Sequence, residues 1–122
     1  MYKTILVETD IEDGKRIWRE LEKHQLPITA AFWFHDEEEE EWKLVIVSPD
    51  VSDKGPRHVY SLLSKVLNDL DTDPRPLQFP LDRVTVVGPY SLLYKMVKQR
   101  SGPVGGPVRE GPVLDAYVYK ME

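Results

Sequence analysis

The chain has 122 residues, no cysteine and a formal net charge of −5 at pH 7. This length suffices for one domain that buries its own hydrophobic core. The lack of cysteine excludes disulfides, zinc–thiolate sites, iron–sulfur clusters and catalytic thiols, and the negative charge opposes broad attraction to nucleic acid or to an anionic membrane.

We expect a soluble, cytoplasmic protein without a membrane partner. The apolar run near the N-terminus is too short for a signal peptide, and no apolar run elsewhere is long enough to span a bilayer. The charge is uneven, since residues 1–61 carry 8 Lys and Arg against 14 Asp and Glu, whereas residues 62–122 carry 8 against 7.

A helix is predicted over residues 10–24. Thr9 followed by Glu12 is typical of a capping box, acidic residues in the first turn suit the helix dipole, and apolar residues recur at helical spacing. Pro27 is expected to end this helix. Residues 2–8 leave two alternatives open, because their apolar run favours a strand and yet also continues the apolar side of the helix backward.

Two hydrophobic segments, residues 28–35 and 42–48, flank six consecutive carboxylates at 36–41. Both segments are apolar on their two faces, which is typical of strands in a sheet covered on both sides. We expect a hairpin whose acidic tip is a solvated turn that discourages edge pairing.

Residues 48–55 have the composition of a turn, and a second helix is predicted to begin at Pro56 with a regular apolar stripe that ends at Leu70. Three prolines within residues 71–82 predict an extended, stiff connection pinned by its apolar residues.

Residues 84–87 are predicted to form a further strand, and residues 113–119 the last one. Between them, Ser91 is expected to cap a short helix, and the three Gly-Pro-Val triplets within residues 101–112 predict a mobile loop. The apolar residues of that short helix are Leu92, Leu93, Met96 and Val97.

The order of elements predicts an α+β fold for residues 1–122, a single domain with a mixed or antiparallel sheet of about four to five strands. The order is helix, strand, strand, helix, strand, helix, strand, with an optional strand in front. If residues 2–8 form that leading strand, the first six elements follow the ferredoxin-like order, in which two helices cover one face of the sheet.

In that arrangement the second face, expected to carry Ala31, Trp33, Val45 and Val47, needs the third helix or a second copy of the chain to cover it. We therefore predict a homodimer. The candidate interface residues are Trp33, Trp42, Val45 and Val47.

One candidate anion site lies at the predicted start of the second helix. Lys54, Gly55, Arg57 and His58 combine free backbone N–H groups with cationic side chains, which together attract phosphate. The alternative is an ordinary Gly-Pro helix start, because Pro56 removes one N–H donor.

A basic surface is predicted in the second half of the chain, because no carboxylate occurs between residues 83 and 109. Its candidate residues are Lys95, Lys98, Arg100 and Arg109.

Other chemistries lack their motifs. The carboxylates at 36–41 have no second arm of ligands for magnesium, and the three histidines have no metal-ligand spacing. Glu41 and Lys43 partly match the carboxylate-x-lysine element of restriction-type nucleases, but Asp36 belongs to the same loop as Glu41. Phosphate-binding glycine motifs and a Ser-His-Asp pattern are absent. We predict no catalytic residue, metal or cofactor.

The favoured hypothesis is a non-enzymatic binding domain that acts through a protein or small-ligand interface. The alternative is a phosphate-handling or nucleic-acid-processing enzyme that uses the basic anion site. The enzyme requires cationic side chains to converge on one cleft with a buried carboxylate. The residues that would have to converge are Lys54, Arg57, Lys95 and Arg100.

The chain also contains a characteristic succession of four short stretches: Ala30 to Trp33, Glu41 to Ile46, Lys54 to Arg57 and Asp115 to Tyr119. This succession resembles small bacterial single-domain proteins of unknown function, over the middle and the tail of the chain. The resemblance implies a bacterial or phage-type stand-alone domain and supplies no catalytic residue.

Overall fold

The structure is a computed structural model that describes residues 8–71, 83–100, 111–113 and 116–121. Helices and strands in these ranges are α1 (Glu8–Lys23), β1 (Ala30–Asp36), β2 (Glu41–Val47), α2 (Asp50–Asp53), α3 (Pro56–Asp71), β3 (Val84–Val87), α4 (Leu92–Arg100), β4 (Gly111–Val113) and β5 (Ala116–Met121).

The strands form one five-stranded sheet in the order β3-β2-β1-β5-β4. β2 and β3 are parallel, and the other neighbours are antiparallel, so the predicted α+β fold with a mixed sheet is confirmed. The leading strand on which the ferredoxin-like order depended falls mostly on residues 1–7, outside the described residues, and Glu8 already belongs to α1.

The two predicted irregular segments lie mostly outside the described residues. The proline-rich connection falls on residues 72–82, after Asp71 as the last residue of α3. The glycine and proline loop falls on residues 101–110, and its final residues contribute to β4 instead.

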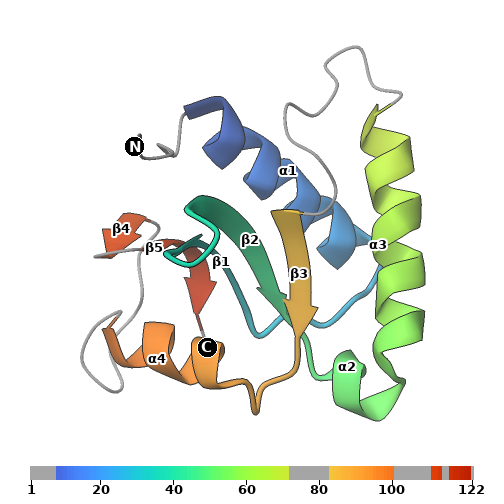
Figure 1. Cartoon of the computed structure of the whole chain (residues 1–122). Coiled ribbons are helices and arrows are strands. Elements are labelled where there is room, and N and C mark those ends of the chain that lie inside the picture. Colours follow the sequence, from blue (N-terminus) through green and yellow to red (C-terminus); the bar gives the residue numbers. More distant parts are fainter. Residues whose placement is uncertain (1–7, 72–82, 101–110, 114–115, 122) are drawn as a thin grey trace.

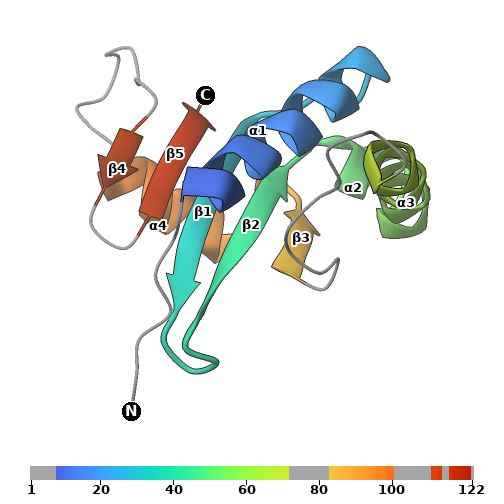
Figure 2. The same ribbon diagram turned by 90° about the horizontal axis from the view of Figure 1, so that it is seen from above.

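The sheet is covered on both faces, as predicted from its doubly apolar strands. α1 and α3 pack on one face, and α4 packs on the other (Figures 1 and 2). The face toward α1 and α3 buries Ala31 and Trp33 of β1 together with Leu44 and Ile46 of β2. The α4 face buries Ala30 and Phe32.

The composition predicted for the second face is wrong because of the strand register. Trp33 lies opposite Leu44 and Phe32 lies opposite Val45, and residues that pair directly point to the same face of a sheet. Val45 therefore belongs to the α4 face, and Trp33 to the α1–α3 face. The turn decides this, because Asp36 pairs with Glu41 and leaves four residues at the tip.

α1 begins two residues before the predicted start, so Thr9 lies inside the helix and the capping box is wrong. The helix ends as a Schellman motif, in which the Leu26 N–H donates to the Leu21 carbonyl at 3.2 Å and Gln25 has a positive φ of 66°. The chain thus leaves the helix before Pro27 is reached.

α3 begins at Pro56 as predicted, and one of its side chains forms a hydrogen bond with the edge strand β3. The backbone N–H of Val86 donates to the Tyr60 hydroxyl at 3.0 Å. Since β3 is the last strand on its side of the sheet, this contact satisfies a donor that an edge strand leaves open (Figure 1).

Two predicted segments differ in detail. The turn at residues 48–55 contains the one-turn helix α2, with the Asp50 N–H donating to the Ser48 hydroxyl at 3.2 Å. The last strand, predicted at 113–119, runs from Ala116 to Met121 and follows the short strand β4. Within the described part of the chain, no helix combines the length and the apolar character needed to cross a membrane.

Candidate interaction surface

The two faces of the sheet are covered to different extents. Two helices of 16 residues each cover one face, whereas α4, with nine residues, covers the other. α4 contributes Tyr94 and Val97 to the core on this face. Three sheet residues, Phe34, Val87 and Met121, and Leu93 of α4 itself stay half-buried against that core.

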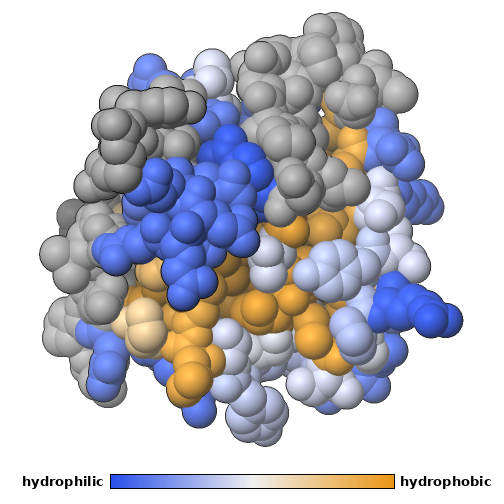
Figure 3. Space-filling model, viewed as in Figure 1, coloured by the Kyte–Doolittle hydropathy of each residue, from blue (hydrophilic) through white to orange (hydrophobic). Residues whose placement is uncertain are grey.

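Exposed large apolar side chains concentrate on the same side of the molecule. Tyr90 is 81% exposed, Leu92 78% and Met96 41%, and among the described residues only Tyr60 of α3, at 39%, joins them in this class. We call Phe34, Val87, Tyr90, Leu92, Leu93, Met96 and Met121 the α4 surface. In Figure 3 an apolar band runs across the molecule below the hydrophilic hairpin.

Of the apolar residues of α4, Leu92 and Met96 face solvent, while Val97 is buried together with Tyr94. Tyr94 and Val97 are three residues apart, which is the spacing of one helix side. The apolar residues on the other sides of α4 are exposed or half-buried.

The acidic hairpin tip borders this surface. Asp36 accepts hydrogen bonds from the backbone N–H groups of Glu38 and Glu39, at 2.9 and 3.3 Å. The ammonium of Lys43 lies 3.3 Å from Asp36 and 3.1 Å from Glu39. One lysine thus pairs with two of the six carboxylates, and the tip remains strongly acidic.

These contacts shift two pKa values in opposite directions. Partial burial alone would raise the pKa of Asp36, but the hydrogen bonds from Glu39, Lys43 and Glu38 outweigh it and hold that pKa below its usual value. The hydrogen bond to Glu39, reinforced by Asp36, raises the pKa of Lys43 against the opposing effect of burial. The ion pair therefore stays intact at neutral pH.

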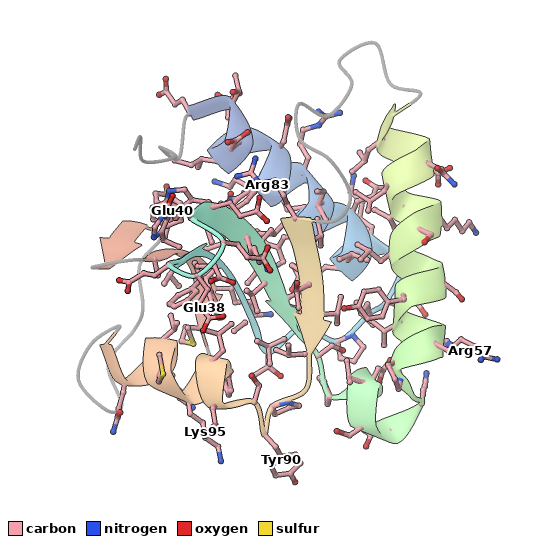
Figure 4. The ribbon with its side chains drawn as sticks, viewed as in Figure 1. Glu38, Glu40, Arg57, Arg83, Tyr90 and Lys95 are labelled. Atoms are coloured by element: carbon pink, nitrogen blue, oxygen red, sulfur yellow. The ribbon has the colours of Figure 1, made fainter. Side chains whose placement is uncertain are left out.

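The structure describes the side chains of two of the four residues predicted to form a basic surface. Lys95 and Lys98 are exposed on α4, and the Lys98 ammonium lies 5.6 Å from the centroid of the Tyr94 ring. Arg100 ends α4, but its side chain and the whole of Arg109 lie outside the described residues. In Figure 4 Lys95 projects away from Glu38 and Glu40, toward the same side of the molecule as Tyr90.

The predicted anion site is an exposed helix start. Lys54 lies 3.8 Å from a carboxylate oxygen of Asp50, and Gly55 has a φ of 92° just before α3. Arg57 and His58 are exposed. Arg57 and Lys95, two of the four side chains whose convergence the enzyme alternative requires, project away from the body of the molecule in different directions (Figure 4).

The residues predicted for an interface belong to the core. Trp33, Val45 and Val47 are buried within the single chain, and Trp42 is half-buried. The register also divides them between the two faces, so the prediction that they share one surface is wrong. The α4 surface takes their place as the accessible apolar region.

A buried cluster of aromatic residues around Arg83 was not predicted. The indole N–H of Trp33 donates to the Tyr119 hydroxyl at 2.8 Å, and that hydroxyl donates to the Ile11 carbonyl. The Arg83 guanidinium lies 5.3 Å from the Trp33 ring and 3.8 Å from the carboxylate of Asp10. These contacts join α1, β1, β5 and the start of β3, and we assign them to stability.

Tyr119 reaches this cluster because the pairing of β1 with β5 shifts register between Ala31 and Phe32. Such a bulge adds a residue to one strand and redirects its side chain. The only sequence signal for the cluster was the glycine at position 14 within a helical pattern.

No group of three or more His, Asp or Glu side chains is arranged to hold a metal ion in the ranges that the structure describes. Comparisons of the chain with protein-family models, with curated proteins and with solved structures find no match.

Proposed function

We propose that this protein is a non-enzymatic binding domain that engages another protein chain through the α4 surface. The observation that carries the proposal is the concentration of Tyr90, Leu92 and Met96, all exposed, beside half-buried residues of the sheet. Burying apolar surface is worth about 25 cal/mol per Å². A contiguous apolar patch is therefore where a partner gains most.

The character of the surface favours a protein partner over a polyanion. Aromatic residues and methionine are enriched where proteins bind one another, and Tyr90 and Met96 supply both. The acidic hairpin tip beside the surface repels a phosphate backbone, and the net charge of −5 adds to this repulsion.

The alternative of a phosphate-handling enzyme has less support. It needs Arg57 and Lys95 in one cleft, and these side chains project in different directions (Figure 4). The lack of cysteine fits a cytoplasmic setting for the binding domain.

Site-specific photo-crosslinking tests the proposal. A benzophenone amino acid replaces Leu92 in one variant and Asn68, an exposed residue of α3, in the control variant. Irradiation of cells that produce the protein is expected to give adducts with a protein chain, of this or another kind, at position 92 and few at position 68. Equal yields at both positions, or none at 92, would contradict the proposal.

A further inference from the structure

Opposite charges lie on either side of the apolar band. The hairpin tip, with Glu38 and Glu40, lies above the apolar band, and α4 carries Lys95 below it (Figures 3 and 4). Lys98, also exposed, follows Lys95 on the same helix. Figure 3 shows apolar atoms between the hairpin and α4, whereas Tyr90 lies on the same side of α4 as Lys95 (Figure 4). Apolar surface thus separates the acidic part from the basic part.

A surface with this order of parts is complementary to itself. In a two-fold dimer both subunits use the same patch, so a part away from the axis meets a different part of the other subunit, and symmetry repeats that contact. Rotation about an axis through the apolar band places the acidic part of each copy against the basic part of its partner. The apolar bands then meet each other.

We propose that the partner of the α4 surface is a second copy of this chain, with the hairpin tip of each copy lying against Lys95 and Lys98 of the other. This inference rests on the proposed function, since it names the partner of the same surface. A surface of one charge sign would repel its own copy, whereas this one attracts it.

The typical size of a stable dimer contact indicates that the contact includes both the hairpin tip and the lysines of α4. Stable protein contacts bury about 800 Å² on each partner and involve about 20 to 30 residues a side. The α4 surface as defined has seven residues, so a contact of that size also includes neighbouring residues, among them those of the hairpin tip and the lysines of α4.

Charge reversal combined with sedimentation velocity of the purified full chain tests this dimer. The variant with Lys95→Glu and Lys98→Glu is expected to dimerise at least about tenfold more weakly than the wild type, because like charges then face each other. The variant with Glu38→Lys and Glu40→Lys is expected to be weakened in the same way.

An equimolar mixture of the two variants should restore dimerisation, because every contact in the mixed dimer again joins opposite charges. The control carries Arg57→Glu and Lys65→Glu on the exposed side of α3, the same charge change away from the contact, and should dimerise like the wild type. Far-UV circular dichroism of each variant reports whether it is folded.

Three results would overturn the dimer: a wild type that stays monomeric at all concentrations, charge reversals without effect, or a mixture that fails to recover. A monomeric wild type that still gives adducts with another protein at position 92 would leave the proposed function standing. Loss of those adducts would remove the proposed function as well.

Discussion

Gly14 allows α1 to approach the sheet at Trp33 and Tyr119. A Cβ atom at this position would lie 2.6 Å from the indole nitrogen of Trp33 and 2.6 Å from the Tyr119 hydroxyl. Those two atoms are hydrogen-bonded to each other, and Trp33 is fully buried, so neither side chain can move aside without loss.

The substitution Gly14→Ala is therefore expected to destabilise the fold by about 1–3 kcal/mol. Helix propensity alone predicts the opposite, a more stable variant, because it favours alanine over glycine by about 1 kcal/mol in a helix interior. Urea unfolding measures the difference. Adding Tyr119→Phe removes one of the two colliding atoms, so the penalty for Gly14→Ala should shrink in that background. A stabilised single variant would show that α1 does not approach the sheet so closely.

The sequence indicates a glycine on the apolar side of a helix, but it cannot indicate what the glycine meets. Tyr119 lies at the other end of the chain and points to α1 because of a bulge in β5. Bulges arise from how two strands pair, and this is not encoded in the residues of either strand alone. The same holds for Val45, whose face is set by the turn length of the hairpin.

At the scale of elements, the hairpin tip is held by Lys43. The pKa of Asp36 is lowered in the folded state, so the pair stabilises the fold above the unfolded pKa of about 3.9 and the contribution is lost as the pH falls through the lower folded value. Removing the ammonium group should bring the pKa of Asp36 back toward its usual value.

The substitution Lys43→Met tests this relation. The Asp36 carboxyl, followed by NMR titration, is expected to take up its proton at higher pH in the variant than in the wild type. Lys54→Met is the matched control, because it removes a lysine that pairs with Asp50 instead. An Asp36 midpoint that does not change with Lys43→Met would show that the lysine does not hold the tip.

In α4 the spacing of apolar residues does not indicate which side of the helix is buried. Its sequence has apolar or aromatic residues at five of the positions from Leu92 to Val97, so a helix is predicted correctly but no single side stands out. The longer α3 has one regular stripe, and its buried residues agree with the prediction. The exposed Leu92 and Met96, on which the proposed function depends, could be found only from the structure.

At the scale of the whole molecule, the sequence predicts the α+β class and most segments, but it does not predict which strands become neighbours. β5 pairs with β1, and β3 joins β2 in parallel, across long separations in the chain. The contact between Asp10 and Arg83 likewise cannot be predicted from the residues around either position. These pairings leave one side of the sheet under a single short helix, and this asymmetry creates the α4 surface.

Correlation spectra of the ¹⁵N-labelled protein, recorded over a range of concentrations, test self-association through the α4 surface most directly. With rising concentration, amide shifts are expected at the hairpin tip, at Phe34 and Val87, and from Tyr90 to Lys98, while the outer side of α3 stays unchanged. Shifts confined to α1 and α3, or spectra that do not change with concentration, would contradict self-association through this surface.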